Sequence, residues 1–249
     1  MQGVVDYRLS PMSKFIVAEG NEGAGKSFFL AEVRAWAARE KKKLFDLILF
    51  AEQESRLPAP EELKGYDALL SQEPSPAWIG KAIREEMVKQ SERTYSGREM
   101  GEAWALDRLI LYRRVIRPAL EMGLTVFSDR SVASSLVYQP ITKPDPIPLD
   151  ELMALPGQRL ALETKIDAMA VYLVDPDESL RRLEAREKKD DAVFEKHAFI
   201  AQVDERYRSE WFRKMFESRG TAIELIDTTH TTTEETQQKT RTFLAHALL

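Results

Sequence analysis

The segment KFIVAEGNEGAGKSFFLAEVRAWAARE, residues 14–40, decides the fold. Its apolar run Phe15–Ala18 predicts a buried strand, and the periodic segment Lys26–Arg39 predicts an amphipathic helix. Between them, Gly20–Ser27 fits G-x-x-x-x-G-K-[ST] in full. Glycines let the backbone curl so that its amides face phosphate oxygens, and the following helix adds its positive N-terminal end. The strand–loop–helix context therefore predicts a nucleoside triphosphate site.

The side chains of this loop indicate how it would handle ATP. A lysine at the position of Lys26 bridges the β- and γ-phosphates, and the hydroxyl of Ser27 can ligate the Mg²⁺ that accompanies ATP. A carboxylate at Glu22 would lie close to an acceptor sugar or to the magnesium, and a solvated loop residue is the alternative. We predict Lys26 to be a catalytic residue and Mg²⁺ to be the cofactor. The residues that we predict to bind ATP form one continuous segment: Gly20, Asn21, Glu22, Gly23, Ala24, Gly25, Lys26, Ser27 and Phe28.

The composition excludes several classes of protein. A net charge of −5 over 249 residues argues against a general nucleic-acid coat and against a cationic membrane binder. The sequence contains no cysteine, which excludes disulfides, thiolate metal sites and cysteine nucleophiles. The longest apolar stretch, Leu44–Ala51, is interrupted by Asp46, and the N-terminus lacks an apolar signal core. We therefore expect no transmembrane helix and a cytoplasmic location.

The rest of the chain alternates short apolar runs with helical periodicity, which predicts an α/β fold with a central parallel sheet and helices on both faces. Four further strands are expected at Leu47–Phe50, Leu124–Phe127, Ala170–Val174 and Ile223–Ile226. Further helices are expected at Ala77–Ser91, Gly101–Glu121, Asp177–Lys188, Phe194–Ser218 and Thr233–Leu249.

Two proline-rich stretches interrupt this alternation. Residues 52–76 hold four prolines and residues 139–157 hold five. Both are predicted to be loops, the first of them an inserted loop. Since predicted strands lie on both sides of each, we expect residues 1–249 to form a single domain.

Residues 101–139 read GEAWALDRLILYRRVIRPALEMGLTVFSDRSVASSLVYQ. Trp104 and Arg108 are four residues apart and share one face of the predicted helix. Asp129-Arg130 directly follows a buried strand, where ligands bind in open α/β sheets. Arginine suits bidentate phosphate contact, and a flat indole offers a stacking face. The alternatives are a core position for Trp104 and a solvated ion pair for Arg108.

These motifs resemble the thymidylate kinase family of P-loop nucleoside monophosphate kinases. Glu19–Ser27 looks like the family's E-G-x-[DE]-G-A-G-K-[ST], and Gln72-Glu73-Pro74 is similar to its R-E-P. Trp104–Leu120 matches its substrate helix, and Asp129–Gln139 matches D-R-[YFH]…S-S…Y-Q. Ile226-Asp227-Thr228 resembles the I-D-A near the adenine site. The resemblance implies a P-loop NTPase three-layer sandwich with a helical lid, and a homodimer formed through helices such as Gly101–Glu121.

On the base side, the resemblance implies a role for each matching residue. Trp104 would stack on the thymine ring, and Arg108 would hydrogen-bond the base. Ser134 and Ser135 would approach the base with polar side chains. Tyr138 would crowd the 2′ position and so favour deoxyribose.

On the phosphate side, the resemblance implies that Arg84 and Arg130 hold the acceptor phosphate. Asp129 and Glu22 would lie near the magnesium, the sugar 3′-hydroxyl and these arginines. Asp129 is therefore predicted to join Ser27 as a metal ligand. The substrate-binding residues that we predict from these matches are Glu22, Glu73, Arg84, Trp104, Arg108, Asp129, Arg130, Ser134, Ser135 and Tyr138.

Residues 177–195 are predicted to form the lid. Arg182 and Arg186 are four residues apart on its helix and share a face. The family places arginines in the lid when the P-loop lacks one, and Gly23 occupies that place here. Since phosphoryl transfer needs cations around the migrating group, Arg182, Arg186 and Arg130 are predicted to be catalytic. An ordinary charged helix face is the alternative for the two lid arginines.

Several positions depart from the family pattern near the acceptor site. Gln72 stands where the family has arginine, and Ser75-Pro76-Ala77 replaces Gly-Gly-Thr. Ser131 replaces an aromatic residue, and Pro140–Pro148 replaces a glycine-rich loop. The phosphate donor motif is unaffected by these departures.

We therefore expect a kinase that transfers the γ-phosphoryl group of ATP to dTMP or a closely related deoxynucleoside monophosphate. A deoxynucleoside kinase is one alternative, because Glu73–Trp78 fits E-P-x-x-x-W and Asp129–Ser131 fits [ED]-R-S. Glu73 would then be the general base for a sugar 5′-hydroxyl. A non-enzymatic P-loop switch is the other, although it would need a guanine-reading motif such as N-K-x-D, which does not occur.

Overall fold

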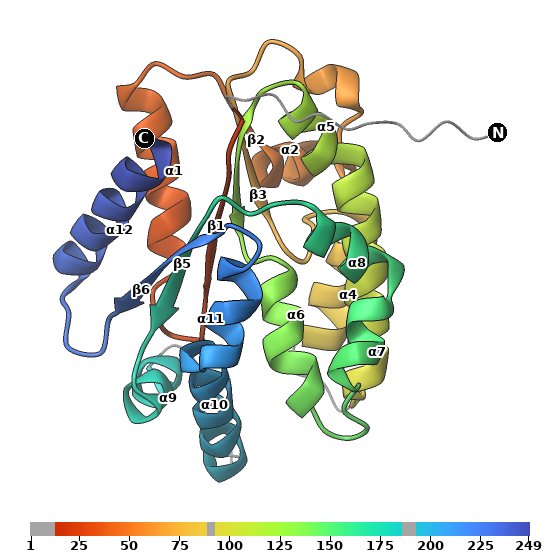
Figure 1. Ribbon diagram of the computed structural model, residues 1–249, viewed down its shortest axis with the longest axis vertical. Coiled ribbons are helices and arrows are strands. Elements are labelled where there is room, and N and C mark those ends of the chain that lie inside the picture. Colours follow the sequence, from red (N-terminus) through yellow and green to blue (C-terminus); the bar gives the residue numbers. More distant parts are fainter. Residues whose placement is uncertain (1–12, 89–92, 186–192) are drawn as a thin grey trace.

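The computed structural model describes residues 13–88, 93–185 and 193–249. Over these residues it contains a six-stranded sheet with the order β2-β3-β4-β1-β5-β6 (Figure 1). Every neighbouring pair is parallel, so the predicted parallel sheet is confirmed. The strands are β1 (Phe15–Gly20), β2 (Leu44–Asp46), β3 (Ala68–Gln72), β4 (Thr125–Asp129), β5 (Ala168–Leu173) and β6 (Ala222–Asp227).

Helices cover both faces of the sheet and give the predicted three layers. In Figure 1, α1 and α12 lie on one side of the strands, and α4, α6, α7 and α8 lie on the other. The α-helices are α1 (Ser27–Arg39), α2 (Leu47–Glu54), α3 (Trp78–Ala82), α4 (Gly97–Leu111), α5 (Arg117–Glu121), α6 (Val132–Tyr138), α7 (Leu149–Ala154), α8 (Pro156–Glu163), α9 (Pro176–Glu184), α10 (Val193–Arg208), α11 (Glu210–Glu217) and α12 (Thr233–Leu248). Two π-helical turns, Ile83–Val88 and Tyr112–Ile116, extend α3 and join α4 to α5.

The core consists of two apolar clusters separated by the sheet. Phe15 and Val17 belong to the cluster under α4 and α6, whereas Ile16 and Ala18 belong to the cluster under α1 and α12. Successive residues of a strand point to opposite faces, so a strand buried on both sides must be apolar at every position. This requirement explains why β1 begins with four consecutive apolar residues.

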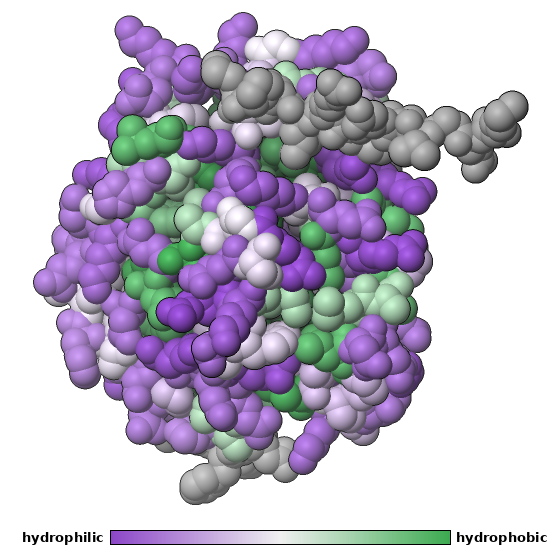
Figure 2. Space-filling model, viewed as in Figure 1, coloured by the Kyte–Doolittle hydropathy of each residue, from purple (hydrophilic) through white to green (hydrophobic). Residues whose placement is uncertain are grey.

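The outer surface is polar in keeping with the composition. Figure 2 shows that hydrophilic residues dominate one face of the molecule, with hydrophobic residues visible between them. Within the described residues, no helix has the length and apolar character needed to cross a membrane.

One predicted strand is wrong. Residues Leu47–Phe50 form the start of helix α2, and the strand lies just before them, at Leu44–Asp46. The Asp46 carboxylate accepts hydrogen bonds from the backbone N–H groups of Ile48 (3.1 Å) and Leu49 (3.2 Å). This N-cap starts a helix at the point where the apolar run alone would suggest a strand.

The two stretches predicted to be loops are also partly wrong. Residues 52–76 contain the end of α2 and strand β3, which is paired on both sides, with β2 and with β4. Residues 139–157 contain α7 and the start of α8, and Pro156 occupies the first turn of α8. Proline is tolerated there because the first N–H groups of a helix have no partner within it.

The predicted helix Phe194–Ser218 is two helices, because α10 ends at Arg208 and α11 begins at Glu210. The Ser209 hydroxyl accepts a hydrogen bond from the Phe212 N–H (3.1 Å) and caps the second helix. Helix α9 ends at Glu184, before the predicted end at Lys188, and residues 186–192 lie outside the described part of the chain.

Helix α8 crosses α4 at Gly157, and the two backbones touch there. A Cβ atom on Gly157 would lie 1.7 Å from the carbonyl oxygen of Ala105. We expect Gly157→Ala to lower the free energy of unfolding by about 2–3 kcal/mol, because the two helices must move apart. Urea denaturation monitored by circular dichroism measures this loss.

Gly65→Ala is the matched control for this prediction. Gly65 has a φ of +83° and no atom within 4 Å of its added Cβ, so only the backbone conformation is penalised, by about 1 kcal/mol. Equal losses in the two variants would contradict a tight crossing of α4 and α8.

Candidate active site

The carboxyl ends of β1, β3 and β4 meet at one edge of the sheet. The register pairs Ala18 of β1 and Gln72 of β3 with Asp129 of β4. The loop that follows β1 therefore lies beside Asp129-Arg130, and the loop that follows β3 lies on their other side. Ligands bind at such strand ends in open α/β sheets.

The loop after β1 is fixed by its neighbours. The Asn21 side chain donates to the Val174 carbonyl (2.9 Å) and accepts from the Val174 N–H (3.2 Å). The Ser179 hydroxyl of α9 donates to the Glu22 carbonyl (2.8 Å), while the Glu22 side chain is exposed. At Gly20, φ is +134° and a Cβ would lie 1.9 Å from the Tyr172 carbonyl oxygen, so only glycine fits.

The second half of the loop connects it to β6 and to α1. Ala24 is fully buried, and its carbonyl accepts a hydrogen bond from the Thr228 hydroxyl (3.1 Å). Gly25 has a φ of +89°, and its carbonyl accepts from the Phe28 N–H (3.1 Å) as the helix begins. Ala24 and Gly25 thus shape the loop through their backbones, which is what a loop that presents amides to phosphates requires. ATP binding by Gly20–Phe28 stays a prediction.

Lys26 folds back over this loop. Its ammonium group donates to the carbonyls of Gly20 (3.0 Å) and Asn21 (2.6 Å). Desolvation and the nearby Arg130 cation lower the pKa of Lys26 to about 7, although the residue is only half-buried and Asp129 acts in the opposite direction. A bound polyphosphate would favour the charged form, as the predicted role of Lys26 requires.

Arg130 has a strained backbone, with φ at +73°, and its N–H donates to the Ala18 carbonyl (2.8 Å). Its guanidinium donates to the Ser134 hydroxyl (2.9 Å) and lies 5.5 Å from the centre of the Tyr138 ring. Ser134, which is predicted to approach the base, therefore holds the arginine that is predicted to bind phosphate. The Tyr138 hydroxyl is buried and has no partner among the described residues.

The residues beside Arg130 fit a hydrated cation. One carboxylate oxygen of Asp129 is buried without a hydrogen-bond partner in the described structure, and carboxylate oxygens are preferred ligands of Mg²⁺. Ser27 is exposed at the start of α1, beyond Lys26. The assignment of Asp129 and Ser27 as the residues that hold the magnesium of Mg-ATP stays a prediction.

Arg108 lies at the centre of a fully buried polar cluster. Its guanidinium donates twice to one oxygen of Glu73 (2.8 and 2.5 Å), to the Ser135 hydroxyl (3.1 Å), to the Ser131 carbonyl (3.1 Å) and to the amide oxygen of Gln158. All five N–H groups of Arg108 are thereby engaged. To read a base as predicted, Arg108 would have to exchange one of these partners for the base.

Glu73 is the counterion of Arg108 within this cluster. Burial raises the pKa of Glu73 to about 7, although the Arg108 charge and hydrogen bond act in the opposite direction. Its second carboxylate oxygen is buried and has no partner in the described structure. In a buried ion pair, the cost of desolvating both charges offsets much of their attraction. Removal of one partner is destabilising because the other charge stays buried without a counterion.

The loop after β3 holds Arg84. Its guanidinium donates to the carbonyls of Ser75 (2.7 Å) and Pro74, and burial lowers the pKa of Arg84. Ser75 in turn donates its N–H (2.7 Å) and its hydroxyl (2.6 Å) to the Asp107 carboxylate. Ser75, which replaces a family glycine, therefore ties this loop to α4. Trp104, one turn before Arg108 on α4, is buried.

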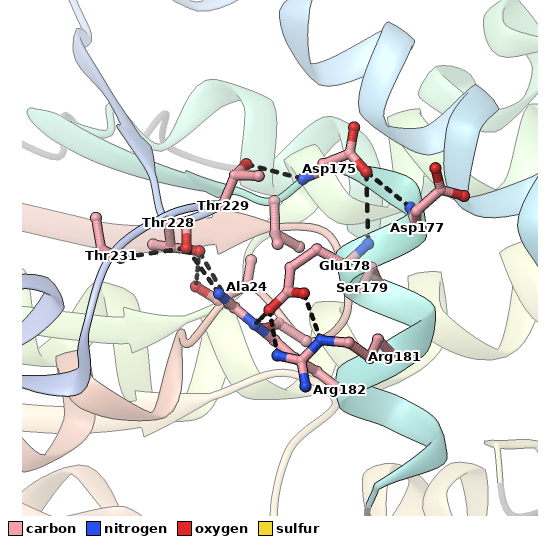
Figure 3. A network of polar contacts seen from close by, with 12 residues as sticks. Ala24, Asp175, Asp177, Glu178, Ser179, Arg181, Arg182, Thr228, Thr229 and Thr231 are labelled. Atoms are coloured by element: carbon pink, nitrogen blue, oxygen red, sulfur yellow. Dashed lines mark hydrogen bonds and ion pairs between the residues drawn. The ribbon is translucent and has the colours of Figure 1, made fainter.

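Arg182 of α9 lies among polar groups of α9 and of the loop after β6, close to the P-loop residue Ala24 (Figure 3). It donates to Glu178 (2.7 Å), to the Gly23 carbonyl (3.1 Å) and to the Thr228 carbonyl (2.7 Å). These contacts join α9 to the P-loop and to the loop after β6. Arg186, the second predicted lid arginine, lies outside the described residues.

Sequence reasoning missed three buried residues of this region. Gln158 directly follows the proline-rich stretch 139–157 that was predicted to be a loop, and Tyr207 is one aromatic residue on a long predicted helix. Glu19 stood in the quoted motif without a role, yet an acid inside an apolar strand is unusual enough to mark it. In the structure, the amide oxygen of Gln158 accepts a hydrogen bond from Arg108, and the Tyr207 hydroxyl donates to the Glu19 carboxylate (2.9 Å).

The parallel sheet and the glycine-rich loop that follows β1 define a P-loop α/β protein. The family model for thymidylate kinase matches residues 60–240. The chain therefore belongs to the thymidylate kinase family, and the resemblance found in its motifs is confirmed.

Three relatives illustrate this membership. A probable thymidylate kinase from Thermococcus gammatolerans is 30% identical over 208 residues, 81% of this chain and 83% of its own. A thymidylate kinase from Caldicellulosiruptor saccharolyticus is 26% identical over 218 residues, 86% and 92% of the two chains. A probable thymidylate kinase from Methanoculleus marisnigri is 27% identical over 194 residues, 77% and 78% of the two chains.

The lowered pKa of Lys26 predicts proton uptake when ATP binds. At pH 8 the free lysine is mostly neutral, and the bound phosphates favour its charged form, so about one proton should be taken up. At pH 6 the lysine is already charged and uptake should be small. Calorimetric titration of Mg-ATP in buffers of different ionisation enthalpy measures the number of protons.

Lys26→Arg is the matched control, because arginine keeps its charge at both values of pH. This variant should lose the proton uptake at pH 8 even if it binds ATP more weakly. The same uptake in both proteins would show that another group accepts the proton.

Removal of Arg108 should expose the cost of the buried pair. We expect Arg108→Ala to lower the free energy of unfolding by about 3–5 kcal/mol, because Glu73 stays buried without its counterion. Arg34→Ala, which breaks the more exposed Arg34–Asp46 pair, is the control and should cost less than about 1 kcal/mol. Denaturant titration measures the free energy of unfolding of both variants. If Arg108→Ala loses no more stability than Arg34→Ala, the pair of Arg108 and Glu73 is not buried as described.

Proposed function

We propose that the protein transfers the γ-phosphoryl group of ATP to the phosphate of dTMP, or of a closely related deoxynucleoside monophosphate. Membership of the thymidylate kinase family is the observation that carries this proposal. The positions of Lys26 and Arg130 support it, because these two cations lie at the carboxyl ends of neighbouring strands. One is suited to the donor phosphates and the other to the acceptor phosphate.

In the proposed reaction, an oxygen of the acceptor phosphate attacks the γ-phosphorus of ATP. The bond from the γ-phosphorus to the bridging oxygen of the β-phosphate breaks, and ADP leaves from the opposite side. The nucleoside diphosphate forms without a covalent intermediate on the protein. Catalysis then depends on positioning and on charge stabilisation, which Lys26, the P-loop amides and Arg130 supply.

When bound with ATP, magnesium would supply positive charge that offsets the charge of the phosphates. Ser27 and the unpaired oxygen of Asp129 would hold it. Glu22 would face the same region from the loop. Arg182 would act by fixing the P-loop at Gly23, and a contact with the migrating phosphoryl group would require it to leave the partners described above.

On the acceptor side, Trp104 would stack on the base, and Arg84 would help Arg130 with the phosphate. Arg108, which is buried with Ser135, would hydrogen-bond the base by exchanging one of its present partners for it. Tyr138 would crowd the 2′ position and favour deoxyribose. Arg108→Ala should accordingly impair use of the acceptor more than hydrolysis of ATP.

The deoxynucleoside kinase alternative is not favoured. The relatives that match the chain are thymidylate kinases, and Glu73, the base required by that alternative, is paired with Arg108 (2.5 Å). We further propose that residues 1–249 work as a single kinase domain in the cytoplasm, as a homodimer formed through α4. The dimer is what membership of the family suggests, and the exposed Leu106 on α4 (48%) is compatible with it.

The test is ADP release with Mg-ATP across a panel of acceptors: dTMP, dUMP, dCMP, dGMP, dAMP, ribosyl TMP and thymidine. We expect the highest kcat/KM with dTMP and no turnover with thymidine. Lys26→Ala is the control, and it should abolish turnover with every acceptor.

Other outcomes would redirect the assignment. Turnover with thymidine but not with dTMP would make Glu73 a general base and the protein a nucleoside kinase. ATP binding without turnover on any member of the panel would mean that the departures near Ser75 and Ser131 serve a different acceptor.

A further inference from the structure

The carboxylate of Glu19 lies fully buried at the end of β1 and joins three elements. One of its oxygens accepts from the N–H (2.7 Å) and the hydroxyl (2.7 Å) of Ser131 and from the N–H of Ser134 (3.3 Å). The other accepts from the Ser134 hydroxyl (2.7 Å) and from the Tyr207 hydroxyl of α10 (2.9 Å). All five hydrogen bonds come from α6, its N-cap residue or α10.

We propose that Glu19 and Tyr207 are positioning residues that fix Arg130, through Ser134, in the orientation that grips the acceptor phosphate. This inference rests on the proposed role of Arg130 in phosphate binding. Neither residue needs to touch the substrate.

The first step of the argument is the direction of the Ser134 hydroxyl. This group has a single proton, and Glu19 accepts it at 2.7 Å. The lone pairs of the oxygen are then free to accept from the Arg130 guanidinium, at 2.9 Å. Without the carboxylate, the hydroxyl could rotate, and its proton could face the guanidinium. Glu19 therefore sets the one side-chain hydrogen bond that Arg130 makes to α6.

The second step is the contribution of α10. Burial, and then the charge of Glu19, raise the pKa of Tyr207 well above its usual range, so its hydroxyl keeps its proton and donates it. The Tyr207 ring also meets the Tyr138 ring edge to face, with centroids 6.4 Å apart. Tyr138 carries the Arg130 cation on its face. Helix α10 thus influences Arg130 in two ways. One is the chain of hydrogen bonds from the Tyr207 hydroxyl through Glu19 and Ser134, called here the hydroxyl route. The other is the ring contact through Tyr138.

The third step is the location of Glu19 in the chain. It directly precedes Gly20, so the backbone that begins the ATP loop also carries the anchor for the acceptor arginine. A buried carboxylate is costly, and an apolar residue would fill the same space at a lower cost. Its five directed hydrogen bonds therefore indicate a requirement for orientation more than for packing.

Tyr207→Phe tests the hydroxyl route alone, because the ring contacts remain. We measure binding of dTMP and of thymidine by calorimetry in the absence of ATP. The affinity for dTMP should fall about fivefold, the size expected for one lost hydrogen bond, while thymidine binding stays unchanged. Only the ligand that carries a phosphate senses Arg130. In turnover assays, the KM for dTMP should rise and the KM for ATP should not.

Tyr172→Phe is the matched control. It removes another buried tyrosine hydroxyl, which is hydrogen-bonded to Thr240 (2.9 Å) between β5 and α12. Its effect on stability should resemble that of Tyr207→Phe, but dTMP and thymidine should bind as they do to the unaltered protein. If both variants bind dTMP more weakly, Tyr207 affects binding only through the stability of the protein, and the inference is overturned.

A double-mutant cycle completes the test. If Tyr207 acts through Ser134, Tyr207→Phe should weaken dTMP binding little further in a Ser134→Ala background. Additive losses would overturn the proposed route. Glu19→Gln should weaken dTMP binding more than Tyr207→Phe, because an amide cannot accept all five bonds. Equal dTMP and thymidine affinities in the unaltered protein would instead overturn the proposed function itself.

Discussion

The structure depends on the register between β1 and β4. The Arg130 N–H donates to the Ala18 carbonyl (2.8 Å), and Ala18 stands opposite Asp129. Because side chains alternate along a strand, a shift by one residue would exchange the faces and separate the glycine-rich loop from the acid and the arginine. Glu19 reinforces this register, since four of its five hydrogen bonds join the end of β1 to Ser131 and to α6. The donor and acceptor sides of the site are therefore aligned by the sheet itself.

Two arginines, the buried Arg108 and the partly exposed Arg130, organise the acceptor side, and segment 131–135 contacts both of them. Ser131 and Ser135 accept hydrogen bonds from Arg108, and Ser134 accepts from Arg130. Ser134 and Ser135 are adjacent on α6, so their hydroxyls can face different arginines. The two arginines are thus set relative to one another by a single rigid element, which is the condition that precise positioning requires. The replacement of an aromatic residue by Ser131 gives Glu19 one of its five hydrogen bonds, the one from the Ser131 hydroxyl (2.7 Å).

The parts of this arrangement that depend on local sequence could be predicted, and those that depend on distant contacts could not. The glycine-rich loop and Asp129-Arg130 follow apolar strands directly, so their neighbours in sequence reveal them. Strand β3 looks like part of a polar loop because its burial comes from β2 and β4 on either side. The run Leu47–Phe50 satisfies both strand and helix patterns, and the Asp46 cap decides between them. The contact of Gln158 with Arg108 spans 50 residues and has no periodic signal.

Helix α9 attaches to the loop after β1, and helix α10 attaches to the end of β1 itself. Arg182 of α9 binds the Gly23 carbonyl, and Tyr207 of α10 binds Glu19, four residues earlier in the chain. The hydrogen bonds of each attachment are worth about 1 kcal/mol each. The burial of Val203 and Tyr207 in the apolar core adds to the attachment of α10. Together the two attachments give α9 and α10 a shared dependence on residues 19–23. Phosphates bound by this loop would contact the same stretch of backbone that both helices hold, which links the donor site to the element that orients the acceptor arginine.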